Sequence, residues 1–201
     1  MNRDFFARDA RLVARDLLGM SLVRVLPDGS VLSGRVVETE AYRENDAASH
    51  SFRRRTTRNM PMFGKPGLAY VYFTYGMHFC FDVTAEPEDH GAGVLIRALE
   101  PLEGVDVMRA NRARGRSSAL IKDRDLLRGP ANLCKAFGID RAFNYYDLLQ
   151  DNSVLFFRAD EAVPDERASA SPRIGIRGDP AALAALWRWY VNDSPSVSGT
   201  K

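Results

Sequence analysis

The segment from Leu68 to Thr84 constrains the fold more than any other part of the chain. It reads LAYVYFTYGMHFCFDVT, two runs of aromatic and β-branched residues that meet at Tyr75 and Gly76. Aromatic and β-branched residues favour strands, and a glycine between two such runs is typical of a hairpin. We therefore expect two antiparallel strands with Tyr75 near the turn that joins them.

The rest of the pattern predicts a mixed α+β fold with an antiparallel sheet. A second hairpin is indicated by two β-prone runs, 22–26 and 31–41, which flank the turn-forming residues PDGS. Helices are expected over 9–18, 103–111, 130–137 and 179–187, and short strands over 93–99, 154–158 and 173–176. No Pro/Gly/Ser-rich linker divides the chain, so we predict one domain over residues 1–201, with a tail that is disordered from about residue 196.

Composition narrows the possible classes. The two cysteines, Cys80 and Cys134, lack the Cys/His spacing of a metal site, which predicts buried free thiols in a reducing compartment. The N-terminal sequence has no continuous apolar core of the kind found in a signal peptide, and no run approaches the roughly 20 apolar residues of a membrane span. We expect a cytoplasmic monomer without a membrane partner.

Positive charge is unevenly placed although the net charge is only +2. The stretch from Arg43 to Gly64 is polar and predicts a long surface loop. Its exposed cations are expected to contact phosphate, for which the planar guanidinium is well suited; they are Arg53, Arg54, Arg55 and Arg58. Codon bias explains an excess of arginine equally well.

Glu40 is the candidate catalytic carboxylate. If the segment is extended, Glu38, Glu40 and Tyr42 share one face, and two neighbouring carboxylates can raise the pKa of one of them. A carboxylate poised near neutrality can deprotonate water for attack on a sugar carbon, as glycoside cleavage requires. The alternative is a pair of solvated glutamates on a strand.

Other candidates each have a structural alternative. Tyr75 at a hairpin tip could fill the gap left by a flipped nucleotide, or could join the aromatic core. Arg97 interrupts the apolar run VLIRAL, where it could pair with an acid, contact phosphate or position a nucleophile. His78, Cys80 and Asp82 alternate along one strand, but no further ligand spacing supports a metal. We expect no cofactor.

Four ordered blocks of sequence resemble one family. They are GRVVETEAY from Gly34, KPGLAYVYFTYGMHFCFDV from Lys65, VLIRALEPLEG from Val94 and KDRDLLRGPANLCKAFGI from Lys122. Together they are similar to the alkyladenine, or 3-methyladenine, DNA glycosylases, and the similarity extends from LVARDLLG near the N-terminus to SPSVS near the C-terminus. The resemblance implies a curved antiparallel sheet, flanking helices and a protruding β-hairpin that enters the DNA minor groove.

The resemblance also implies roles for individual residues. Glu40 would activate water, with Arg97 near that water and the DNA backbone, and Tyr75 would intercalate where the damaged nucleotide left the stack. The extruded base would lie among Tyr42, His50 and Tyr72, with Met62 and Met77 as apolar flanks of the wedge. The expected partner is double-stranded DNA with damaged purines, in base excision repair and, in a bacterium, on the nucleoid.

Asp82 departs from the family pattern, which has asparagine at this position near the amino group of a bound guanine. We expect the carboxylate to accept from that amino group and to widen the substrate range towards methylguanines. Alternatively, an ionised Asp82 would couple its titration to that of Glu40 or would increase the preference for cationic bases. No residue can be named as an acid for neutral lesions, so hypoxanthine and ethenoadenine rank below 3-methyladenine as expected substrates.

Cleavage is expected to stop at the abasic site, because no lysine in these blocks resembles a Schiff-base nucleophile. Two other classes remain open. A non-catalytic module could recognise distorted DNA through Tyr75 and the arginines, and a hydrolase of free nucleosides could use the same carboxylate.

Overall fold

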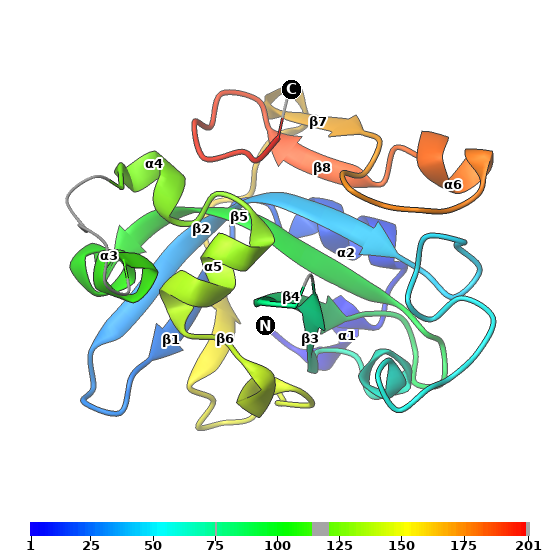
Figure 1. Cartoon of the computed structure of the whole chain (residues 1–201), viewed down its shortest axis with the longest axis horizontal. Helices are drawn as coiled ribbons and strands as arrows, with labels where there is room; N and C mark the ends of the chain where they lie inside the picture. Colours follow the sequence, from blue (N-terminus) through cyan, green and yellow to red (C-terminus); the bar gives the residue numbers. More distant parts are fainter. Residues whose placement is uncertain (75, 114–120, 200–201) are drawn as a thin grey trace.

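Two long strands, β2 (Val31–Tyr42) and β5 (Gly93–Glu103), cross the centre of the fold and pair with each other (Figure 1). The computed structural model describes residues 1–74, 76–113 and 121–199. Around the central pair the strands run in the order β3 (Ala69–Thr74), β4 (His78–Thr84), β5, β2, β1 (Ser21–Val25) and β6 (Leu155–Arg158). Beside β2 lies β8 (Arg188–Val191), which also pairs with β7 (Ala168–Ser171). Every pairing among these strands is antiparallel.

Helices cover both faces of the sheet. In Figure 1, α5 (Pro130–Phe137) lies in front of the sheet and α2 (Ala10–Asp16) behind it. Proline at the first turn and Gly138 in the left-handed conformation (φ 62°) set the limits of α5. The other helical segments are α1 (Arg3–Phe6), α3 (Val105–Ala113), α4 (Asp123–Leu126), α6 (Pro180–Ala184), and the 3-10 turns Met60–Phe63, Arg141–Phe143 and Asp165–Arg167.

Strand β2 is irregular at Glu38. Its register with β5 shifts between Val36 and Glu38 and again between Glu38 and Thr39, where Arg97 of β5 is passed over. Bulges increase local twist and redirect side chains, and they occur often beside active sites. Because both faces of β2 are covered here, the residues from Val36 to Ala41 are all buried, including the two glutamates.

Much of this architecture agrees with the sequence-based expectations. The antiparallel α+β fold, the β1–β2 pairing, α2 and α5 are confirmed. Strands β3 and β4 pair as expected, from Ala69 opposite Val83 to Thr74 opposite His78. Tyr75, between them, lies outside the described residues, and the insertion of this hairpin into DNA stays a prediction. Both cysteines are buried and free, as expected.

Two expectations about the C-terminal part are wrong. Residues 173–176 form a loop rather than a strand, because Gly175 takes a positive φ of 72° and Arg173 turns inward. The tail expected to be disordered from about residue 196 is packed as far as Ser198: Val197 is 2% exposed, and the Ser198 N–H donates to Glu38 Oε2 over 2.7 Å. A buried carboxylate requires hydrogen-bond donors, and the bond from Ser198 to Glu38 holds the tail in place.

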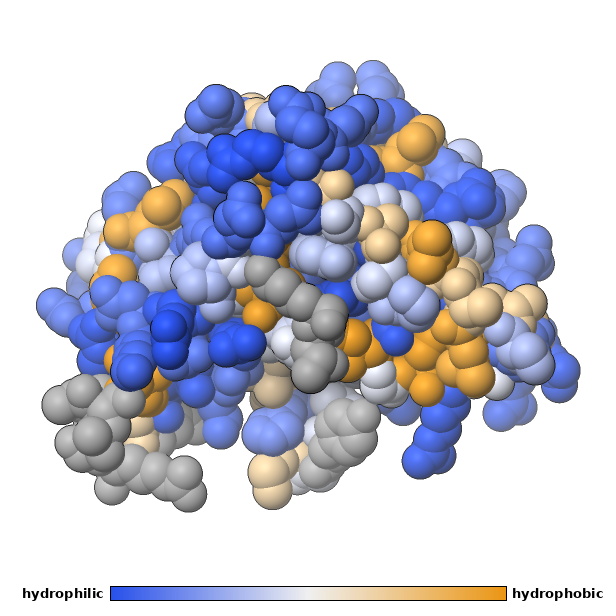
Figure 2. All heavy atoms as spheres, turned by 90° about the horizontal axis from the view of Figure 1, so that it is seen from above, coloured by the Kyte–Doolittle hydropathy of each residue, from blue (hydrophilic) through white to orange (hydrophobic). Residues whose placement is uncertain are grey.

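The surface is mainly polar. Figure 2 shows a face on which hydrophilic residues dominate and apolar residues form small separate patches. Among the described helices, none has both the length and the apolar character needed to cross a bilayer.

Candidate active site

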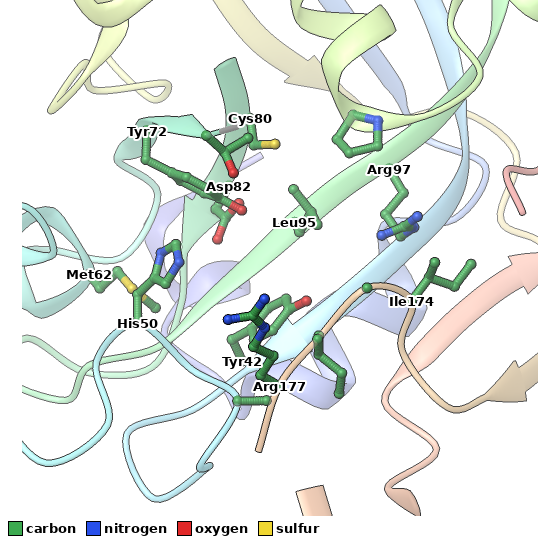
Figure 3. Close-up of a pocket in the computed structure, with 15 residues that line it drawn as sticks. Tyr42, His50, Met62, Tyr72, Cys80, Asp82, Leu95, Arg97, Ile174 and Arg177 are labelled. Atoms are coloured by element: carbon green, nitrogen blue, oxygen red, sulfur yellow. The ribbon is translucent and has the colours of Figure 1, made fainter. Parts of the chain in front are cut away.

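A cavity of about 470 Å³ opens against the sheet, within the range of small-molecule sites (Figure 3). Its walls combine the sheet with loops that are distant in sequence. They include Tyr42 and Arg97 from the central strands, Tyr72, Cys80 and Asp82 from β3 and β4, His50 and Met62 from the long loop, and Ile174 to Arg177 from the C-terminal loop. The sequence predictions placed Tyr42, His50, Tyr72 and Asp82 in one pocket, and the structure brings these four residues together.

One row of cross-strand neighbours runs through this region. Leu95 on β5 is paired with Glu40 on one side and with Asp82 on the other, and Asp82 is paired in turn with Tyr70. Directly paired residues in antiparallel strands project from the same face. Two carboxyl groups therefore project from the same face, on strands that flank β5.

Glu40 is fully buried and held by two hydrogen bonds and one ion pair. Its Oε2 accepts from the Tyr42 hydroxyl at 2.6 Å, and its Oε1 accepts from the Ile174 N–H at 2.8 Å. Arg97 Nη1 lies 3.1 Å from the same Oε1. All three partners line the cavity, although Glu40 itself lies behind its wall. The carboxylate is thus fixed in orientation directly beneath the pocket.

Glu38 is buried in a different setting. Its Oε1 accepts from Arg97 Nε at 3.0 Å and from Arg188 Nε at 2.6 Å, while Oε2 accepts from the Ser198 N–H. Arg97 bridges the two glutamates, so it pairs with acids as one of the sequence hypotheses held. The two carboxylates and the two guanidinium groups balance in charge, which buried ions require.

Aromatic rings form the sides of the cavity. In the view of Figure 3, Tyr72 and His50 lie on one side and Tyr42 on the other. The His50 ring meets Tyr72 edge to face at 4.6 Å, and its Nδ1 is 3.0 Å from the Tyr70 hydroxyl. Partial desolvation and the nearby Arg58 cation lower the pKa of His50 to about 4, so its imidazole is neutral at neutral pH.

Asp82 has no comparable partners. The residue is 3% exposed, and its Oδ1 is buried without a hydrogen-bond partner among the described residues. Burial raises the pKa of Asp82 well above its usual range, and the negative charge of Glu40 raises it further. The negative charge of Glu40 thus adds to the effect of burial, and both favour the protonated form of Asp82.

The loop from Arg173 to Arg177 was missed as part of the site. Arg173 is buried, forms an ion pair with Asp46 (Nη2 to Oδ1, 2.9 Å), and stacks 4.7 Å from the Tyr42 ring centre. This anchor places the Ile174 N–H on Glu40. No local sequence signal could have found this loop, because the burial of Arg173 depends on Asp46, which lies 127 residues away in the chain.

The arginines of the long loop lie in two settings. Arg53 and Arg54 are exposed and form no ion pair within the described part of the chain. Arg55 pairs with Asp89 at 2.9 Å, and Arg58 lies over the Tyr72 ring at 5.7 Å. Arg53 and Arg54 are therefore available to another anion, whereas Arg55 and Arg58 also make contacts that stabilise the loop and the pocket wall.

The two methionines that were expected beside the hairpin tip, Met62 and Met77, lie in different environments. Met77 is 67% exposed, which suits a surface contact. Met62 is 1% exposed, packs with Phe63 and Tyr70, and lines the cavity, and its expected place as a flank of the wedge stays a prediction. The 3-10 turn Met60–Phe63 directs this side chain inward.

The possible metal ligands do not assemble. Cys80 and Asp82 both line the cavity, whereas His78 does not, and the described residues contain no group of three or more His, Cys, Asp or Glu placed to hold a metal ion.

Comparison with known proteins identifies the family. Residues 4–195 match the Methylpurine-DNA glycosylase (MPG) family. Relatives named "Putative 3-methyladenine DNA glycosylase" include one from Clostridium botulinum (strain Loch Maree), 43% identical over 98% of both chains, and one from Carboxydothermus hydrogenoformans, 44% identical over 98% of this chain and 97% of the relative. The chain belongs to the methylpurine-DNA glycosylase family.

Membership of this family defines the chemistry at a coarse level. The protein is a DNA glycosylase, a hydrolase of N-glycosyl bonds that acts on DNA in repair.

Proposed function

We propose that this protein flips alkylated purines, 3-methyladenine first, out of duplex DNA and hydrolyses their N-glycosidic bonds with a water activated by Glu40. The observation that carries the proposal is that Glu40 is anchored by Tyr42, Ile174 and Arg97, all of which line one base-sized cavity. An ionised carboxylate offers about four acceptor positions. These three partners leave about one position for the attacking water.

Substrate selection is proposed to follow from the aromatic walls. Alkylated purines carry a positive charge, and the faces of tyrosine rings attract cations. Tyr42 and Tyr72 would stack on the extruded base, with His50 beside Tyr72. A damaged base also unstacks more easily than a sound one, so flipping adds to the selection.

The reaction is proposed to end at the abasic site. No lysine is among the described residues that line the cavity, so no amine is available there for a Schiff base with the sugar. A protein–DNA adduct trapped by borohydride would contradict this part of the proposal.

DNA contacts are proposed to come from two features. Tyr75, aided by the exposed Met77, would enter the stack, and the exposed Arg53 and Arg54 would contact phosphates. Replacing Arg54 with alanine should weaken binding to all sequences and reduce the slope of log affinity against log salt by about 1. An unchanged salt slope would exclude a phosphate contact by Arg54.

The central test compares wild type with Glu40→Gln on duplexes that each carry one defined lesion, with free base quantified in a single turnover. Loss of the general base should reduce release by about 10²- to 10⁴-fold, while DNA affinity, measured by fluorescence anisotropy, stays unchanged. Glu103→Gln is the matched control, because Glu103 is an exposed glutamate at the far end of β5.

Each outcome separates the alternatives. Binding to damaged DNA without base release by either protein would favour a recognition module. Release from free nucleosides but not from duplex DNA would favour a nucleoside hydrolase. Full activity of Glu40→Gln would assign the water to another residue.

A further inference from the structure

Asp82 is the one acid among the described residues that line the cavity, and the proposed reaction assigns it no role. Its carboxyl group lines the cavity, is 97% shielded from solvent (3% exposed), and carries a buried Oδ1 without a partner in the described part of the chain. Figure 3 shows it between Tyr72 and Tyr42, where the walls would enclose a base. An unpartnered polar atom in such a place calls for a ligand that supplies the missing hydrogen bond.

The charges around Asp82 favour its neutral form. Glu38 and Glu40 are compensated by Arg97 and Arg188, and no ion pair joins any described residue to Asp82. Ionised Asp82 would add an uncompensated buried negative charge next to Glu40. The titratable and charged groups that face it or share its cavity are Glu40 and Tyr42 from β2, Tyr70 and Tyr72 from β3, Cys80 from β4, Arg97 from β5, Cys134 from α5, and His50 and Arg177 from the loops.

The other groups in the cavity are poor proton donors. His50, with a pKa of about 4, is already neutral at neutral pH. Desolvation raises the pKa of Cys80 to about 12 and holds those of Tyr42 and Tyr72 well above their usual value. A general acid works best when its pKa is near the working pH. Among these groups, only Asp82 is moved towards that condition.

We propose that Asp82 is the general acid for neutral damaged purines, donating its proton to a ring nitrogen of the flipped base as the N-glycosidic bond breaks. This inference rests on the proposed function and deepens it. Cationic bases such as 3-methyladenine leave without protonation, whereas hypoxanthine and ethenoadenine become good leaving groups only when protonated. Asp82 thereby extends the substrate class from alkylated cations to neutral lesions.

The step balances with the two carboxyl groups alone. The N9–C1′ bond breaks and its electron pair leaves with the purine, while the proton of Asp82 moves to the purine ring. The water oxygen bonds to C1′, and the proton released by that water passes to Glu40. The pair holds one proton before the step, on Asp82, and one after it, on Glu40. Exchange with solvent restores the starting arrangement once the products leave.

The position of the two groups suits this division of labour. Glu40 and Asp82 lie on strands that flank β5, with Leu95 between them. Two strand spacings correspond to roughly 10 Å between backbones. An acid and a base on opposite sides of a scissile bond, separated enough to admit water, form the arrangement used by inverting glycosidases.

The test compares wild type, Asp82→Asn and the control Glu103→Gln in single-turnover base release from duplexes carrying hypoxanthine, ethenoadenine or 3-methyladenine. None of these bases has the 2-amino group of guanine. A steric clash between that group and the asparagine of the variant therefore cannot account for a slower release. Asp82→Asn should slow release of the neutral bases by about 10²-fold or more. It should change release of 3-methyladenine by less than about tenfold, and the alkaline limb of the wild-type pH profile for hypoxanthine should disappear.

A second measurement does not depend on activity. The infrared carbonyl band of a protonated carboxylic acid should be present at neutral pH in wild type and absent from Asp82→Asn. A missing band, or equal losses for cationic and neutral bases, would overturn the assignment of Asp82 as the acid. Release of 3-methyladenine but not of hypoxanthine by wild type would overturn this inference alone, whereas release of neither would overturn the proposed function.

Discussion

Two acids, Glu38 on β2 beside β8 and Asp82 on β4, are buried in opposite ways. Beside β8, Glu38 forms ion pairs with Arg97 and Arg188 and accepts an N–H from the tail. On β4, Asp82 has no ion pair with any residue that the structure describes, and its pKa is raised. A protein can bury a carboxyl group either by compensating its charge or by leaving the proton in place. Glu40 is linked to both acids: it shares Arg97 with Glu38, and its negative charge adds to the effect of burial on the pKa of Asp82.

The largest effect is expected from removing the compensated acid. Glu38→Ala would leave Arg97 and Arg188 without their shared buried carboxylate, and breaking such a pair costs about 3–5 kcal/mol. Urea denaturation should show this loss, with no comparable change in the control Glu103→Ala. A loss below about 1 kcal/mol would mean that water compensates these cations.

A somewhat smaller loss is expected from shortening the tail. Ending the chain at Ser196 removes the buried Val197 and the donor from Ser198 to Glu38. Burial of a valine and a hydrogen bond to a charged group contribute about 1.5–3 kcal/mol each, and the chain entropy that the freed tail regains lowers the expected net loss to about 2–4 kcal/mol. Ser198→Ala, which keeps the N–H and removes only the hydroxyl next to Arg97, is the graded control and should lose much less.

The effect of Asp82, which has no compensating cation among the described residues, should appear in the pH dependence of stability. Because folding raises the pKa of Asp82, its contribution to stability is complete below the unfolded pKa and is lost as pH rises through the folded pKa. Wild type should therefore lose stability relative to Asp82→Asn between these values, by about 1.4 kcal/mol per pH unit for one proton. Thermal melts of both proteins across this pH range would show parallel curves if Asp82 were ionised throughout.

The smallest effect is expected from a solvent-exposed ion pair, which serves as the reference for the buried ion pairs. Arg3 and Asp147 form an ion pair of 2.8 Å, but both side chains are about a third exposed (36% and 32%). Asp147→Asn should change stability by less than about 1 kcal/mol, since exposed pairs contribute little. The oxygen that caps Leu149 is retained in asparagine. A loss as large as that of Glu38→Ala would remove the distinction between buried and exposed pairs.

The predictions from sequence succeeded where local chemistry decides the structure. The PDGS turn fixed the β1–β2 pairing, and proline and glycine set the ends of α5. The pocket residues Tyr42, His50 and Tyr72 were named through the family resemblance, whereas alternation along strands placed Tyr42 on the face of Glu40 and Asp82 on that of Cys80. The family resemblance then gave these positions their proposed roles.

The failures share a physical cause, because each depends on contacts between distant residues. The alternation at 173–176 predicts a strand, but Arg173 turns inward to Asp46, which lies 127 residues away. The tail is polar in sequence, yet it is ordered by Glu38. The raised pKa of Asp82 depends first on its burial and then on the negative charge of Glu40, which lies on another strand. No local pattern carries this information.

The partners of Glu38 also bear on the order in which the molecule assembles. Arg97 is 59 residues along the chain from Glu38, Arg188 is 150 and Ser198 is 160. During synthesis the two glutamates leave the ribosome long before these partners. Until the partners are made, the negative charge on β2 is only partly neutralised. Contacts of such high sequence separation slow folding. Closure of the sheet by β8 and the tail is thus expected to be the last event of folding, and the cavity becomes competent only when it is complete.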